Sequence, residues 1–102
     1  MPSKGKVDAD FWKRADAHVV LANNQLDKAV DAGQVCASIL YAAARFNAFA
    51  TSSQAPDLAT LKAARSDAVK YYTEQFKRMF EDNIDEQIAN FDKYFGSQSK
   101  RH

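Results

Sequence analysis

One histidine in the interior of the sequence has the neighbours that acid–base chemistry would use. His18 follows Asp16 by two positions, and Arg14 lies one helical turn before it. A carboxylate that orients an imidazole can create a general base. Residues two apart on a helix face different directions, however, so Asp16 is badly placed to orient His18. The pattern therefore favours a partly buried His18 that is satisfied by a backbone or amide group.

Two further polar groups interrupt an alanine-rich apolar segment, SILYAAARFNAFA at residues 38–50. Arg45 projects from the face opposite Ile39 and Phe46, which predicts solvent or a partner surface around it. Asn47 falls on the flank of the apolar stripe, where an unpaired amide would cost about 1–3 kcal/mol. Asn47 is therefore expected to have a partner.

A third polar outlier is Arg65, which projects into the apolar face of the predicted third helix. Either its stem packs and its head reaches water, or it is paired with a carboxylate. We predict a small polar network in which Arg65 or Asn47 meets Asp16. Its candidate members, which would alternatively line a pocket, are Arg14, Asp16, His18, Asn23, Arg45, Asn47 and Arg65.

The sequence lacks the patterns of common catalytic and metal sites. It has no Glu-x-x-His pair for a di-iron centre, no Cys and His cluster for zinc and no Asp-x-Asp-x-Asp-Gly loop for calcium. It also has no Gly-rich phosphate loop and no Gly-x-Ser-x-Gly. The single Cys36 has apolar neighbours, which predict burial as a small hydrophobe. We predict no metal, no cofactor and no catalytic residue; enzymatic activity stays open but is disfavoured.

Composition and charge restrict the class of protein. The chain has 102 residues, 46% of them hydrophobic, and a formal charge of +1. This predicts one domain without the basic excess that nucleic-acid binding exploits. No run reaches the ~18 apolar residues of a membrane span, and the polar N-terminus does not indicate secretion. The expected location is the cytoplasm, with neither nucleic acid nor membrane as partner.

The spacing of apolar residues predicts an all-α antiparallel helical bundle. One helical domain is expected over residues 8–95, between flexible ends at 1–7 and 96–102. The apolar faces of at least three helices should close on each other. These faces comprise Phe11, Trp12, Ala15, Val19, Ala22, Leu26, Ala29 and Val30 in the first helix; Val35, Ile39, Ala42, Ala43, Phe46, Phe49 and Ala50 in the second; and Leu58, Leu61, Ala68, Val69, Tyr72, Phe76, Met79 and Phe80 in the third.

The first helix is expected to begin near Asp8, whose carboxylate can cap free amides while Val7 packs on Trp12. It should run to about Asp31, where Gly33 would supply a left-handed stop. The second helix follows after a very short turn and ends in the TSSQAP loop. The third helix should begin around residue 57.

The end of the third helix can be interpreted in two ways. The apolar register continues through Ile84 and Ile88, so one long or kinked helix is possible, and its far half would need a partner. Asn83 and Glu86 resemble a capping box, and the acidic residues at 81–86 repel each other in a continuous helix. The balance favours a kink or break at Asn83, which gives three long helices and a shorter C-terminal fourth helix.

Three segments resemble a known family. They are FWKRADAHVVLANNQ at residues 11–25, GQVCASILYAAARFNAFA at 33–50 and YYTEQFKRMFEDNIDEQIANFDKY at 71–94. Together they are similar to the small bacterial proteins catalogued as domain of unknown function 3144, over nearly the whole chain. The resemblance implies a bacterial cytoplasmic protein and no particular activity.

Two classes of function remain. The first is a non-enzymatic protein-interaction or structural module, for which we expect self-association as a homodimer because small domains gain stability from association. Its candidate surfaces are a helix face with Tyr41, Arg45 and Ala48, and a C-terminal interface formed by Phe91, Tyr94 and Phe95. The second is a small-ligand or catalytic protein with a polar pocket around Asp16, His18, Arg45 and Asn47. The lack of any reaction-specific pattern favours the first class.

Overall fold

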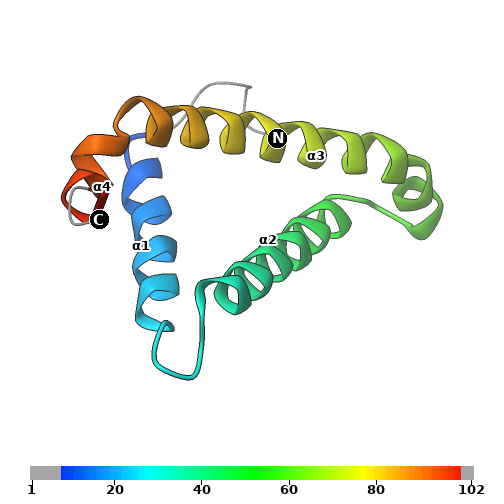
Figure 1. The fold of residues 1–102 in the computed structure, drawn as a ribbon. Coiled ribbons are helices and arrows are strands. Elements are labelled where there is room, and N and C mark those ends of the chain that lie inside the picture. Colours follow the sequence, from blue (N-terminus) through cyan, green and yellow to red (C-terminus); the bar gives the residue numbers. More distant parts are fainter. Residues whose placement is uncertain (1–7, 100–102) are drawn as a thin grey trace. The chain divides into compact units, whose positions relative to one another are not determined.

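Residues 8–99 form four helices in the computed structural model, which describes this part of the chain. They are α1 (Phe11–Asn24), α2 (Ala32–Ser53), α3 (Leu58–Ala89) and α4 (Phe91–Ser99) (Figure 1). No strand occurs within residues 8–99. The predicted all-α class, with three long helices and a shorter fourth one as in a helical bundle, is confirmed. The predicted flexible end at 96–102 overlaps α4, which continues to Ser99.

The chain divides into two compact units. The first ends at Phe49 and contains α1 and most of α2, and the second begins at Ala50 and contains the end of α2 together with α3 and α4. The single helical domain over residues 8–95 stays a prediction. None of the helices in residues 8–99 combines the length and the apolar character that crossing a membrane requires.

Asp8 organises the start of α1. Its side-chain Oδ1 accepts a hydrogen bond from the amide of Asp10 at 3.0 Å, and its carbonyl accepts one from the amide of Phe11 at 3.1 Å. Asp8 therefore satisfies amides at the helix start, as expected, although the helix itself begins at Phe11. The predicted packing of Val7 on Trp12 lies outside the described residues.

The first helix ends at Asn24, so the predicted extension to about Asp31 is wrong. The reason is local polar chemistry. Oδ1 of Asp27 accepts hydrogen bonds from the second and third amides after it, both at 2.8 Å, which forms a turn. Asp31 and Gln34 then form a reciprocal capping box at the start of α2. The amide of Gln34 donates to Oδ1 of Asp31 at 2.9 Å, and the amide of Asp31 donates to Oε1 of Gln34 at 2.8 Å. Gly33 lies in the first turn of α2 and is not a left-handed stop.

Asp57 caps α3, which confirms the predicted start of this helix. Its backbone is extended, and its Oδ1 accepts a hydrogen bond from the amide of Thr60 at 2.7 Å. This hydrogen bond favours the ionised carboxylate and lowers the pKa of Asp57 below 3.8.

The cap at Asp57 gives a testable prediction. Asp57→Ala should lower the melting temperature by about 5 °C, which is the change expected for a domain of this size when a helix loses its N-cap. Asp57→Asn should retain most of the stability, since an amide oxygen also caps. Folding lowers the pKa of Asp57, so the ionised carboxylate stabilises the folded chain above pH 3.8. This contribution to stability is lost as the pH falls through the pKa of Asp57 in the folded chain. Thermal unfolding of the three proteins between pH 2 and 7 measures both effects, and an unchanged alanine variant would contradict the cap.

The third helix continues through Asn83, so the favoured break at this residue is wrong. The side-chain Nδ2 of Asn83 donates to the carbonyl of Met79 at 2.8 Å, back along the same helix, and thus does not cap a new one. The acidic side chains at 81–86 are exposed, where water weakens their repulsion. The break comes at Asn90, whose backbone leaves the helical region at φ −117° and ψ 24°.

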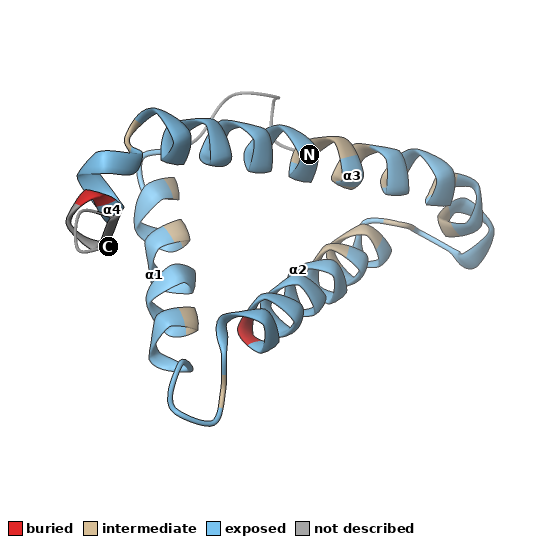
Figure 2. Cartoon of the chain, in the orientation of Figure 1, coloured by how far each residue is buried: buried red, intermediate tan, exposed pale blue. Residues whose placement is uncertain are grey.

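Most residues of these helices are exposed (Figure 2), and most of their large apolar side chains are among them. Among the apolar side chains of residues 8–96, only Val35 is buried, with 6% of its surface exposed. Trp12, Phe46 and Phe76 expose 66%, 68% and 55% of their surface. The apolar residues have helical spacing, but the burial predicted for these faces is wrong for most of their large side chains, which are exposed.

Candidate functional site

Arg14 has a partner that the sequence did not point to. Its guanidinium donates to both carboxylate oxygens of Asp8, at 3.1 and 2.6 Å. The two side chains are 59% and 61% exposed, so the pair contributes little to stability. The hydrogen bond from Arg14 lowers the pKa of Asp8 below 3.8. Because Asp8 precedes the helix, a helical projection could not reveal this contact.

His18 is exposed, so the prediction of partial burial is wrong. Ala15 and Ala22, one turn away on either side, are half-buried and small, which leaves the larger imidazole ring in water. Asp16 is also exposed, and neither side chain has a hydrogen bond or ion pair with another described residue of the first unit. The arrangement gives no orienting contact for a catalytic base.

The remaining predicted network residues are placed as follows. Asn23, Arg45 and Arg65 are exposed, and Arg45 thereby has the environment predicted for it. Asn47 is half-buried and takes part in an interaction, and the expected partner of its side-chain amide stays a prediction. The network that would join Asp16 to Arg65 or Asn47 stays a prediction.

The structure also places the single cysteine and the candidate metal-ligating side chains of the described residues. Cys36 is exposed, so its predicted burial is wrong. It follows the buried Val35, and one residue along a helix turns the side chain by about 100° to another face. Among residues 8–99, no group of three or more His, Cys, Asp or Glu side chains is arranged to hold a metal ion.

Polar and aromatic contacts concentrate where α3 passes into α4. Glu86 Oε2 accepts hydrogen bonds from the Tyr94 hydroxyl at 2.8 Å and from Asn90 Nδ2 at 3.0 Å. In α4, the ring centroid of Phe95 lies 5.2 Å from that of Phe91 and 6.3 Å from that of Tyr94. The three aromatic residues predicted as an interface are exposed, and Phe95 contacts the other two. The spacing of Glu86, Asn90 and Tyr94, four residues each, was the sequence signal for this corner.

The bond from Tyr94 to Glu86 gives a second prediction. Its hydrogen bond with the carboxylate raises the pKa of Tyr94 above 10, since ionising the phenol would remove the donor and place two negative charges together. Because folding raises this pKa, the contribution to stability is present below pH 10 and is lost as the pH rises through the folded value. Glu86→Gln should lower the pKa of Tyr94 towards 10, as measured by NMR titration of the ring Cζ. An unchanged value would contradict the contact.

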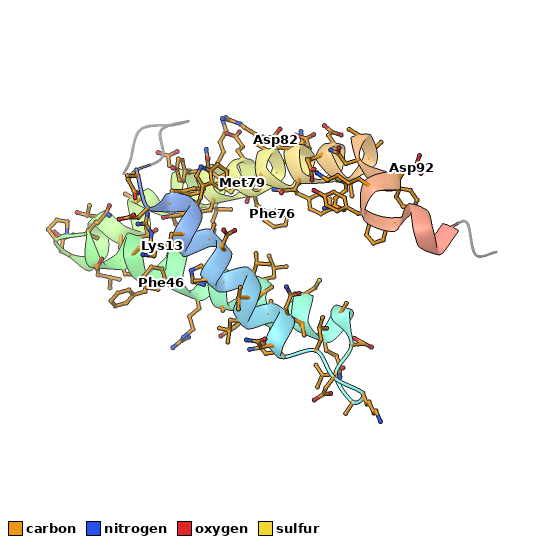
Figure 3. The ribbon with its side chains drawn as sticks, turned by 90° about the vertical axis from the view of Figure 1, so that its left-hand side faces the viewer. Lys13, Phe46, Phe76, Met79, Asp82 and Asp92 are labelled. Carbon is orange, nitrogen blue, oxygen red and sulfur yellow. The ribbon has the colours of Figure 1, made fainter. Side chains whose placement is uncertain are left out.

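Exposed apolar side chains follow each other along the second half of α3 and into α4. We call them the α3–α4 apolar surface, and they expose 39–69% of their area. Apart from the adjacent Met79 and Phe80, they recur at steps of three or four residues, which keeps those of α3 on one broad face. Figure 3 shows Phe76 and Asp82 on opposite sides of α3. The surface consists of Phe76, Met79, Phe80, Ile84, Ile88, Phe91 and Phe95.

The fold and this surface define a small all-α protein with exposed apolar helix faces. The chain belongs to the family described as "Protein of unknown function (DUF3144)", which it matches over residues 11–88. The resemblance seen in the sequence is thus confirmed. The fold is similar to the NMR structure of the protein NB7890A from Shewanella sp., with a TM-score of 0.71 and 31% sequence identity over 89% of this chain and 96% of that chain. No curated protein matches this chain.

Proposed function

We propose that this chain is a non-enzymatic helical module that binds protein through the α3–α4 apolar surface, in the cytoplasm of a bacterium. The observation that carries the proposal is the exposure of seven large apolar side chains at helical spacing. Single exposed apolar residues are ordinary, but a contiguous apolar patch typically marks an interaction site. The Shewanella source of the similar structure supports a bacterial origin.

The composition of the surface also supports protein binding. Four of its seven side chains are phenylalanines and one is a methionine, and both residue types are enriched in interface cores. Charged side chains at 81–86 lie beside it and are exposed, as in the polar rim of an interface.

The alternative of a polar pocket around Asp16, His18, Arg45 and Asn47 has weaker support. A ligand site needs polar groups that converge on one enclosed position. Asp16, His18 and Arg45 are exposed, and within residues 8–49 no hydrogen bond or ion pair joins their side chains.

Truncation of a surface residue tests whether this face serves binding or internal packing. Ile88→Ala should change the free energy of unfolding by less than about 0.5 kcal/mol in dilute solution, because 69% of Ile88 is exposed. The matched control Val35→Ala should lower it by about 2 kcal/mol, because Val35 is buried. Urea unfolding at low protein concentration measures both. A loss of 2 kcal/mol or more for Ile88→Ala would mean that the face packs within the chain, and would contradict the proposed function.

A further inference from the structure

We propose that the partner of the α3–α4 apolar surface is a second copy of this chain, packed antiparallel along α3 about a two-fold axis near Phe80. The inference rests on the proposed function and adds the identity and orientation of the partner. It is carried by the distribution of charge along α3 and by the positions of the exposed apolar residues.

The charges of α3 are separated by sign on either side of Phe80. The part that precedes it has five cations and two anions, whereas the part that follows it has four anions and no cation up to Ala89. None of these side chains forms an ion pair within residues 8–99. The cations are Lys62, Arg65, Lys70, Lys77 and Arg78, and the anions are Asp67 and Glu74 before Phe80 and Glu81, Asp82, Asp85 and Glu86 after it.

Antiparallel packing of two copies would bring opposite charges together. The basic part of one α3 would lie along the acidic part of the other, with Lys77 and Arg78 near Glu81 and Asp82 of the second copy. Parallel packing would instead place four anions beside four anions. An interface with two-fold symmetry must be complementary to itself, and this sequence of charges is complementary to itself only in the antiparallel orientation.

The apolar residues fit the same two-fold axis. Phe76 and Ile84 are each four residues from Phe80, and Tyr72 and Ile88 are each eight residues from it. An antiparallel pair centred on Phe80 therefore places Phe80 against Phe80, Phe76 against Ile84, and Tyr72 against Ile88. Each of these three layers matches an apolar side chain with an apolar side chain.

The size of the surface is close to that of one side of a specific dimer interface. Seven large side chains that are each about half exposed offer roughly 100 Å² apiece, or roughly 700 Å² per copy. A stable interface of standard size buries about 800 Å² per partner. The α3–α4 apolar surface is thus close to what one two-fold contact requires.

Charge reversal tests the partner and its orientation together. The basic half is reversed in Lys77→Glu/Arg78→Glu, the acidic half in Glu81→Lys/Asp82→Lys, and both halves in the variant with all four changes. The control Lys13→Glu/Lys28→Glu makes the same change in net charge as the first variant at exposed positions of the first unit. Sedimentation equilibrium gives the dimer dissociation constant of each protein, and circular dichroism gives its helix content.

The antiparallel dimer predicts a distinct pattern of results. Each half-reversed variant should dissociate at least tenfold more readily than the natural chain, because like charges then face each other. The fully reversed variant should recover the affinity, and the control should keep it. Any of three results would overturn the inference. The natural chain could be monomeric at all concentrations, or the half-reversed variants could dimerise normally or lose their helix content. The fully reversed variant could also fail to recover the affinity of the natural chain. A monomer in which Ile88→Ala is harmless would leave the proposed function standing, whereas a destabilised Ile88→Ala would remove both.

Discussion

Phe80→Glu is expected to weaken self-association at least 100-fold while the chain keeps its helix content. The two-fold axis places Phe80 of one copy against Phe80 of the other, so the change removes two apolar rings and sets two carboxylates against each other. In the isolated chain Phe80 is 56% exposed, and glutamate is a good helix former, so the fold should tolerate the change. Sedimentation equilibrium measures the affinity.

Phe46→Glu is the matched control for this variant. Phe46 is an aromatic residue of similar exposure, but it lies on α2 and outside the α3–α4 apolar surface. Its replacement should leave the dissociation constant unchanged within about threefold. If Phe46→Glu weakened association as much as Phe80→Glu, the contact would not be specific to α3, and the two-fold axis near Phe80 would be wrong.

Asn83→Pro is expected to lower the free energy of unfolding by about 3 kcal/mol or more. Proline in a helix interior removes the amide that bonds four residues back, and its ring clashes with the carbonyl there, which is that of Met79. Urea unfolding followed by circular dichroism measures the loss. The variant is informative because Asn83 lies inside a continuous α3 that runs on to Ala89, whereas a helix boundary at this residue would tolerate proline far better.

Asn83→Ala completes this experiment. Alanine is the better helix former, so the change should be neutral or slightly stabilising at an interior position. An asparagine that capped a new helix would lose about 1 kcal/mol on the same replacement. A loss of that size would contradict an uninterrupted α3.

The helices could be predicted where local chemistry determines them. Asp57 follows Pro56 in a polar loop and caps α3 where the sequence indicated. At the first junction, the capping box of Asp31 and Gln34 was a local signal too, but the apolar spacing that continues past Asn24 concealed it. Asn83 shows the opposite error, because a capping pattern is present although the helix continues.

Burial could not be predicted in the same way, because it depends on groups far apart in the chain. The spacing of Phe76, Phe80 and Ile84 predicts an apolar face correctly, but it cannot say whether this chain or another one covers the face. His18 and Cys36 were both expected in partly or fully buried positions for the same reason, and both are exposed. The partner of Arg14 was missed because Asp8 lies before the helix.

The distance between two copies of one residue on α3 tests the antiparallel dimer most directly. A spin label attached through Asp67→Cys, in a Cys36→Ser background, places one label thirteen residues before Phe80 in each copy, at an exposed position. The antiparallel dimer separates the two labels by 26 residues of helix, so pulsed dipolar spectroscopy should give a distance of roughly 40 Å. Parallel helices would instead give a distance below about 20 Å, and this result would contradict the antiparallel dimer. The absence of dipolar coupling at high protein concentration would also contradict it.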